Sequence, residues 1–150
     1  MKKMNTAPTK LLLADDDIDD CFLFQEALNE ISANTILTIA NDGAELMDLL
    51  TSNAVLPAAV FLDLNMPRKN GFECLKEIKQ NQQLRALPVI IYSTSFDKDV
   101  IKLLYSQGAL CYIRKPADFP KIREVIEHAL LLISQTTNLQ PKIDNFILQV

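Results

Sequence analysis

The sequence has no long apolar segment, no excess of positive charge and no set of cysteines suited to a disulfide framework. Its longest helical apolar run, residues 129–133, falls far short of the roughly 20 residues that cross a bilayer, so no membrane span is expected. The net charge is −4 and the pI is near 4.9, and no basic patch interrupts this acidic balance. Such a surface repels phosphate backbones and anionic lipids, so we expect protein partners rather than direct contact with nucleic acid or membrane.

Features of exported proteins and of cysteine-ligated zinc sites are also missing. Residues 1–4 are positively charged, but no apolar segment of useful length follows, so export is not expected. Cys21, Cys74 and Cys111 are odd in number, widely spaced and set in apolar patterns, which favours buried, reduced thiols in the cytoplasm over disulfides or zinc ligands. The single histidine, His128, falls on the polar side of a helical pattern, where a solvated role is expected.

Short apolar runs alternate with amphipathic segments along most of the chain. The expected strands are residues 10–14, 35–40, 60–62, 88–93 and 109–114. The expected helices are residues 17–31, 44–52, 71–80, 97–107 and 118–134. Strict alternation requires parallel pairing with right-handed crossovers, so we predict one α/β domain over residues 10–135 with a single doubly wound sheet. Residues 1–9 are predicted to be a flexible lead.

Polar residues stand where the predicted strands end. Asp15 and Asp16 follow the first strand, Asp63 follows the third, Ser93 ends the fourth and Lys115 follows the fifth. Each has a plain structural reading by itself, as a loop cap or a surface residue. In a parallel sheet, however, these ends share one edge, where α/β proteins bind their ligands. The alignment of four strand ends therefore favours one functional pocket.

The residue types indicate phosphate chemistry assisted by a metal. Three neighbouring carboxylates raise one another's pKa unless a cation compensates them. Oxygen ligands without histidine or thiolate suit Mg²⁺, which is usually held by one or two carboxylates and a phosphate. Lys115 and Ser93 are suited to phosphoryl oxygens, which leaves Asp63 as the nucleophile and an acyl phosphate as the expected intermediate.

These motifs resemble the receiver domain of bacterial two-component response regulators, in the stand-alone CheY-like form. The resemblance covers residues 10–134 and rests on four ordered motifs: Leu13-Ala14-Asp15-Asp16, Leu62-Asp63-Leu64-Asn65-Met66-Pro67, Ser93 and Lys115-Pro116. It implies a flavodoxin-like fold whose five-stranded parallel sheet has the order 2-1-3-4-5. It also implies a signalling phosphoprotein of a phosphorelay rather than an enzyme with turnover.

The resemblance assigns roles in metal and phosphate binding. Asp63 would accept a phosphoryl group from a histidine kinase or a histidine phosphotransfer protein. Asp16, Asp63 and the backbone carbonyl of Asn65 would bind Mg²⁺, and Asp15 would contribute through water.

The resemblance also assigns a switch. Ser93 would turn toward the phosphate, and Tyr112 would change its exposure with it, although a packed strand aromatic is the alternative for Tyr112. Lys115 would pair with the phosphoryl oxygens, and its bond to Pro116 would be cis. Output would be a contact with a downstream protein through the face of the fourth helix, fifth strand and last helix, and a homodimer is a further expectation.

Some positions depart from the family pattern. The run of three aspartates leaves Asp16 and Asp17 as an alternative acid pair, although the apolar block ending at residue 14 favours Asp15 and Asp16. Serine at position 93, where threonine is commoner, loses a methyl group that biases the rotamer, so looser switching is expected. Ala117 stands where an aromatic residue is frequent, with Phe119 as its candidate substitute.

Two other functions remain open at this stage. One is a Mg²⁺-dependent phosphatase with an aspartyl phosphate, similar to the haloacid dehalogenase group. Asn65 stands where that group has a second acid, which counts against turnover. The other is a receiver-like scaffold that is not phosphorylated.

Residues 136–150 exceed what this fold needs. Helical spacing separates the apolar residues of this tail, which are Ile143, Phe146, Ile147 and Val150. One prediction is a short amphipathic helix that docks on a protein surface, which could be that of a second copy. The alternative is a tail that is disordered or packed on its own domain, since isolated helices this short are marginal.

Overall fold

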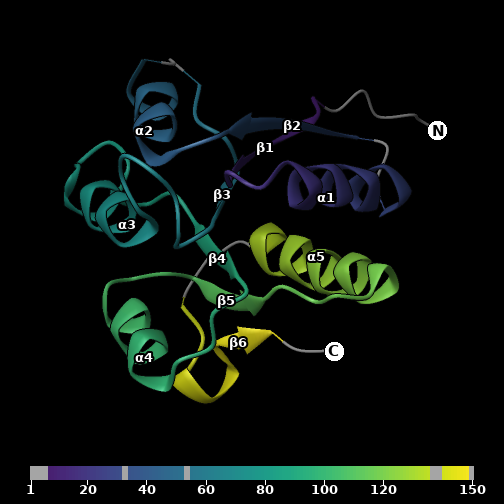
Figure 1. Ribbon diagram of the computed structural model, residues 1–150. Coiled ribbons are helices and arrows are strands. Elements are labelled where there is room, and N and C mark those ends of the chain that lie inside the picture. The colour runs from purple at the N-terminus through teal and green to yellow at the C-terminus, as the bar shows by residue number, and fades with distance from the viewer. Residues whose placement is uncertain (1–6, 32–33, 53–54, 136–139, 149–150) are drawn as a thin grey trace.

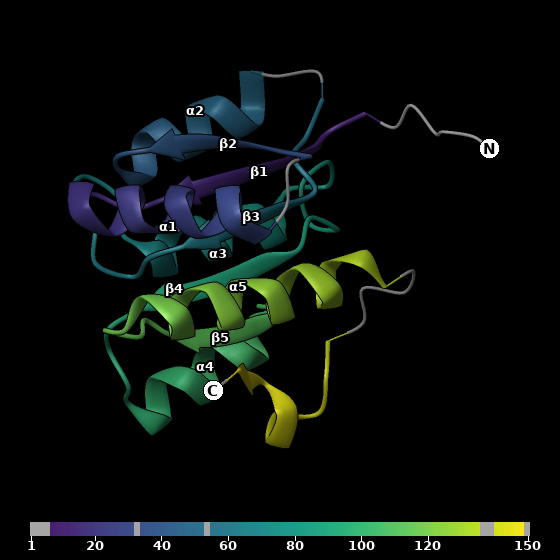
Figure 2. The same ribbon diagram turned by 90° about the vertical axis from the view of Figure 1, so that its right-hand side faces the viewer.

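The protein is a three-layer α/β structure built around one parallel sheet (Figures 1 and 2). The computed structural model describes residues 7–31, 34–52, 55–135 and 140–148. Most of the predicted lead (1–6) and two parts of the tail (136–139 and 149–150) lie outside the described residues. The strands are β1 (Thr9–Ala14), β2 (Thr35–Ala40), β3 (Ala59–Leu62), β4 (Val89–Ser93), β5 (Cys111–Arg114) and β6 (Ile147–Leu148).

The strand order is β2-β1-β3-β4-β5-β6, and every neighbouring pair is parallel. The expected order of the first five strands is therefore confirmed, but the described residues contain a sixth strand that the sequence did not indicate. Helices α1 (Ile18–Ile31) and α5 (Phe119–Ser134) cover one face of the sheet, and α2 (Gly43–Ser52), α3 (Gly71–Gln80) and α4 (Lys98–Ser106) cover the other (Figures 1 and 2).

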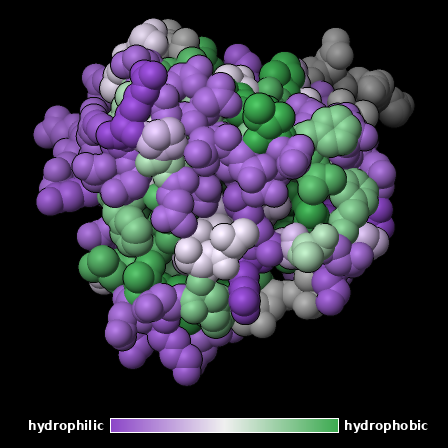
Figure 3. Space-filling model, in the orientation of Figure 1, coloured by the Kyte–Doolittle hydropathy of each residue, from purple (hydrophilic) through white to green (hydrophobic). Residues whose placement is uncertain are grey.

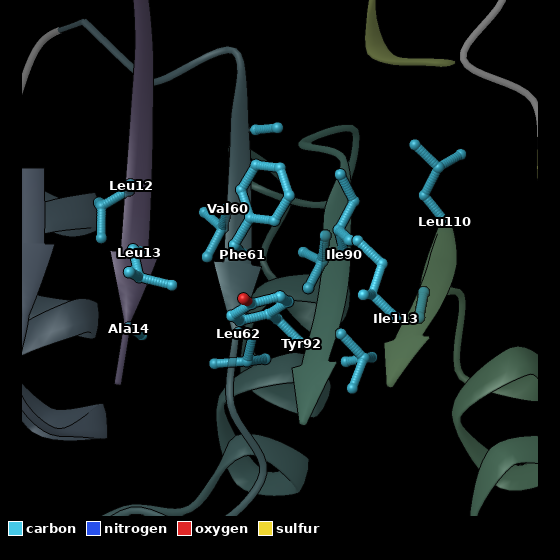
Figure 4. Close-up of a cluster of buried hydrophobic side chains, with 14 of the residues drawn as sticks. Leu12, Leu13, Ala14, Val60, Phe61, Leu62, Ile90, Tyr92, Leu110 and Ile113 are labelled. Atoms are coloured by element: carbon cyan, nitrogen blue, oxygen red, sulfur yellow. The ribbon is translucent and has the colours of Figure 1, made fainter. Parts of the chain in front are cut away.

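Burial follows the position of each strand in the sheet. Every residue of β3 and β4 is buried, as expected for central strands covered on both faces, whereas β2 alternates between half-buried and exposed residues at the sheet edge. Between the sheet and α1, the ring of Phe24 lies edge-on to Phe61 at 4.9 Å and to Tyr92 at 5.3 Å. Apolar side chains of β1, β3, β4 and β5 pack side by side in this core (Figure 4).

Short polar residues cap the N-termini of several helices. Asp17 caps α1 by accepting from the Asp20 N–H at 2.9 Å, and Asn70 forms a capping box on α3. Asp97 caps α4 by accepting from the N–H groups of Asp99 and Val100. Gly108 follows the C-cap of α4 with φ of 96°, a left-handed conformation that glycine adopts without strain.

The surface carries no dominant apolar face in the view of Figure 3, where hydrophobic side chains form separate patches among hydrophilic ones. The most exposed large apolar side chains are Ile18 and Phe22 of α1, Leu131 of α5 and Val55, which precedes β3. No helix in the described part of the chain combines the length and the apolar character that crossing a membrane requires.

The described part of the tail packs on its own domain, which was one of the alternatives that the sequence left open. It does so as a strand, so the amphipathic helix and the disordered segment were wrong for the residues described. A single turn of 3-10 helix (η1, Ile143–Asn145) precedes β6. Phe146 is fully buried, its ring lies 5.1 Å from that of Tyr105, and its carbonyl accepts from the Tyr112 N–H at 2.9 Å. Gln140 donates its side-chain amide to the Tyr105 carbonyl at 2.7 Å. An unpaired β5 edge is thereby covered.

We predict that Phe146→Ala will detach β6 without unfolding the domain. Removing a buried phenylalanine costs about 3–5 kcal/mol, and β6 pairs with a single strand among the described residues. The amide of Tyr112 should then exchange with solvent at least about tenfold faster, as measured by hydrogen exchange. Ile143→Ala is the matched control because Ile143 is 44% exposed. Equal protection of Tyr112 in both variants would contradict this role for Phe146.

Candidate functional site

Four strand ends bring their polar residues to one edge of the sheet. The ladder continues one residue beyond the strands, since Asp63 donates its N–H to the Ala14 carbonyl at 3.0 Å and Lys115 donates its N–H to the Ser93 carbonyl at 2.8 Å. Asp15, Asp63 and Ser93 are the buried polar or charged residues in the described part of the chain. The predicted convergence is therefore present in the structure.

The carboxylates form one cluster of oxygen ligands. One oxygen each of Asp15, Asp16 and Asp63 lie within 4.8 Å of one another, and Asp16 is exposed to solvent while the other two are buried. Asp17 instead caps α1, so the structure selects Asp15 and Asp16 as the acid pair. An open corner of carboxylate oxygens without nitrogen or sulfur fits a hard divalent cation.

A tight loop fixes the orientation of Asp63. Its Oδ1 accepts from the Leu64 N–H at 2.8 Å, and Gly71 donates its N–H to the Leu64 carbonyl at 2.9 Å. A Cβ on Gly71 would lie 2.3 Å from the Asp63 carbonyl oxygen, so the loop can fold back only with glycine at this position. The carbonyl of Asn65 as a metal ligand stays a prediction. The side-chain amide of Asn65 donates to the Ser95 hydroxyl at 3.4 Å.

Lys115 reaches three carboxylates. Its Nζ lies 2.8 Å from Asp15 Oδ2, 2.8 Å from Asp20 Oδ2 and 3.6 Å from Asp63 Oδ2, and its side chain is 7% exposed. Sequence reasoning did not identify Asp20 as a site residue. The available signal was a carboxylate one helical turn after Asp16, at the start of the helix that leaves the site.

Burial raises the pKa of the site carboxyls, and Lys115 opposes this effect. Burial raises the pKa of Asp63 to about 6, against the lowering effect of Lys115. Burial also raises the pKa of Asp15, again opposed by Lys115. For Lys115 itself, burial lowers the pKa, but its hydrogen bonds to Asp15 and Asp20 outweigh burial and the net shift is upward. Lys115 is therefore held as a cation.

The two predicted switch residues contact the same loop. Ser93 is fully buried, and its Oγ accepts from the Ser95 N–H at 3.2 Å. Tyr112 is also buried and donates its hydroxyl proton to the Ser95 carbonyl, while its ring lies edge-on to Phe96 at 6.5 Å. Movement of Ser93 or Tyr112 stays a prediction.

Two expectations at the end of β5 have different outcomes. The bond between Lys115 and Pro116 is trans, since the described residues contain no cis peptide bond, so the cis assignment was wrong. Ala117 is exposed and Phe119 is half-buried, which leaves the substitute role of Phe119 a prediction.

A carboxylate cluster with a lysine, at the carboxyl edge of a parallel sheet of order β2-β1-β3-β4-β5-β6, defines a receiver-like α/β fold. The model of the response regulator receiver domain matches residues 11–127, and the chain belongs to this family.

Similar proteins include both sequences and solved structures. The response regulator Rcp1 of Synechocystis sp. is 32% identical over 132 residues, which cover 85% of this chain and 90% of that protein. The phosphorylated cyanobacterial phytochrome response regulator RcpA has a TM-score of 0.80 at 33% identity, covering 87% of this chain and 97% of that one. The Mn²⁺-bound form of Rcp1 has a TM-score of 0.76 at 31% identity, covering 89% and 99%.

We predict that Asp63→Asn will stabilise the protein in metal-free buffer at neutral pH. The pKa of Asp63 is higher in the folded state, about 6, than the ordinary value near 4 expected on unfolding. The folded protein therefore binds more protons between these values, and the free energy of unfolding falls as the pH rises through that interval. Removing the carboxylate should raise the free energy of unfolding at pH near 7.5 by about 1–3 kcal/mol.

Urea unfolding across this pH range, in the presence of a chelator, measures the effect. The fall in stability between pH near 4 and pH near 6 should be smaller in Asp63→Asn than in the parent protein. Asp48→Asn, an exposed carboxylate on α2, is the control for loss of one negative charge. A variant less stable than the parent at neutral pH would show that the buried Asp63 carboxylate does not cost stability.

Proposed function

We propose that this protein is a response regulator that accepts a phosphoryl group on Asp63 in the presence of Mg²⁺, in a histidine-to-aspartate phosphorelay. The observation that carries the proposal is the geometry of the pocket. A nucleophilic carboxylate lies in one acidic cluster with Asp15 and Asp16, and Lys115 stands 3.6 Å from its Oδ2. Because the pKa of Asp63 is about 6, the carboxylate is mainly ionised at neutral pH.

The transfer requires little chemistry from the protein beyond alignment and charge. A bond forms between an Asp63 carboxylate oxygen and phosphorus while the bond from phosphorus to the imidazole nitrogen of the donor breaks, and the electron pair stays on that nitrogen. Asp15, Asp16 and Asp63, with the Asn65 carbonyl, would hold Mg²⁺, which supplies neutralising charge to the transferred group.

Lys115 and Ser93 would bind the phosphoryl group on Asp63. Lys115 offers a compact cation to one phosphoryl oxygen, and its backbone N–H bond to Ser93 keeps the two residues on adjacent strand ends. Ser93 offers a hydroxyl, which reaches the phosphoryl group by releasing the Ser95 N–H. That release would change the loop on which the Tyr112 hydroxyl is held, and so transmit the phosphorylated state to β5.

Output is proposed to occur on the face of α4, β5 and α5. A hollow of about 490 Å³ lies beside the β5 and α5 part of this face, lined by Phe96, Arg114, Lys121, Val125 and Leu148 of β6 among others. Arg114 stacks on the Phe96 ring at 5.0 Å, so this hollow combines positive charge with apolar surface on an acidic protein. It suits a protein partner with an acidic segment, and a second copy of the chain remains part of the proposal.

The donor and the setting complete the proposal. The phosphoryl donor would be a histidine kinase or a histidine phosphotransfer protein, and the protein itself would act as a signalling acceptor rather than a turnover enzyme. The three free cysteines are buried, which agrees with action in the reducing cytoplasm. The acidic net charge of −4 favours protein partners over direct contact with nucleic acid or membrane.

We predict that incubation with Mg²⁺ and a small acyl phosphate will add one phosphoryl group, as read by intact mass. The adduct should be lost in Asp63→Asn and in the presence of a chelator, and retained in Asp48→Asn. Because the adduct is an acyl phosphate, it should be cleaved by hydroxylamine. No adduct on the parent protein would contradict the proposed function, and steady phosphate release from varied monoesters would support the phosphatase instead.

A further inference from the structure

Asp20 competes for the one cation of the pocket. Lys115 donates a hydrogen bond to Asp20 Oδ2 at 2.8 Å, whereas its distance to Asp63 Oδ2, 3.6 Å, is beyond hydrogen-bond length. The Lys115 side chain is 7% exposed and that of Asp20 is 31% exposed, so solvent screens this pair only in part.

The start of α1 holds Asp20 in place. The Asp20 N–H is bonded to the Asp17 carboxylate at 2.9 Å, and the next residue, Cys21, is buried with its thiol 3.6 Å from the Asp15 carbonyl. The Asp17 cap thus fixes the helix start before Asp20, and the Cys21 thiol after it joins the first turn to Asp15 at the end of β1. A carboxylate fixed in this way keeps Lys115 near Asp15 and away from the phospho-acceptor.

We propose that Asp20 is a positioning residue that holds Lys115 away from Asp63 until a phosphoryl group takes its place. This inference rests on the proposed function of Asp63 as phospho-acceptor. A phosphoryl group on Asp63 brings oxygens that Lys115 can bind, but Lys115 must first weaken its bond to Asp20. Asp20 therefore lowers the affinity of the pocket for the phosphoryl group.

The same residue has the opposite effect on the metal. Lys115 contacts the carboxylates of Asp15, Asp20 and Asp63. Asp16 lies in the ligand cluster with Asp15 and Asp63, so Asp20 adds a negative charge to a site that already holds more carboxylates than the one ammonium can balance. With Asp20 present, Lys115 also stays farther from Asp63, one of the candidate ligands. Both effects strengthen the attraction of the pocket for a divalent cation.

The test compares Asp20→Asn with Asp19→Asn, which removes the same charge from the neighbouring, exposed residue of α1. Calorimetric titration with Mg²⁺ measures cation binding. Fluorine NMR of the beryllofluoride adduct at saturating Mg²⁺ measures affinity for a phosphoryl analogue. For Asp20→Asn we expect Mg²⁺ affinity to fall about twofold to fivefold and analogue affinity to rise about threefold to tenfold. Asp19→Asn should change neither by more than about twofold.

A second set of variants separates positioning from simple charge loss. If Asp20 acts through Lys115, the gain in analogue affinity should disappear when Asp20→Asn is made in a Lys115→Gln background. Asp20→Glu, which keeps a carboxylate within reach of Lys115, should restore Mg²⁺ affinity to near the parent value.

The outcomes distinguish this inference from the proposed function. If the parent protein bound neither Mg²⁺ nor beryllofluoride, the proposed function itself would fail. If the parent bound both and Asp20→Asn matched Asp19→Asn, Asp20 would have no positioning role. An analogue gain that persisted without Lys115 would also overturn the inference, because charge alone would then explain it.

Discussion

One buried ammonium compensates the carboxylates at the carboxyl edge of the sheet, and the site depends on it. Asp15 is fully buried, and a buried carboxylate without a partner is strongly destabilising. Lys115 is that partner, at 2.8 Å. It also joins Asp20, which is 95 residues away in the chain, to the end of β5. The pocket therefore exists only when the whole sheet is assembled, and its charges in turn require this one lysine.

The balance of charge at the pocket favours binding over stability. Lys115 contacts three carboxylates, and Asp16 lies beside two of them, so negative charge is in excess. Burial of part of this charge raises the pKa of Asp63. A protein selected for stability alone would place apolar or neutral side chains there. A divalent cation and a phosphoryl group supply charges that the chain itself lacks, so the unliganded pocket is prepared for both.

The sequence predicted what depends on local pattern and failed where tertiary packing decides. The first five strands followed from short apolar runs. Three of these runs stop at Asp15, Asp63 and Lys115, and parallel strands place such ends together. The contact of Asp20 depends on how α1 lies against the end of β5, which periodicity along one helix does not contain. The cis bond before Pro116 came from resemblance alone, and the structure has a trans bond there.

The sixth strand shows the same limit from the other direction. The apolar spacing in the tail predicted a helix. A strand forms there instead because the edge of β5 would otherwise be unpaired. Phe146 fills the space beside Tyr105, and its carbonyl binds the N–H of Tyr112. The hydroxyl of Tyr112 binds the Ser95 carbonyl. If phosphorylation moves the loop at Ser95 as proposed, Tyr112 transmits the movement through β5 to β6. A partner that binds at β5 then also contacts the tail.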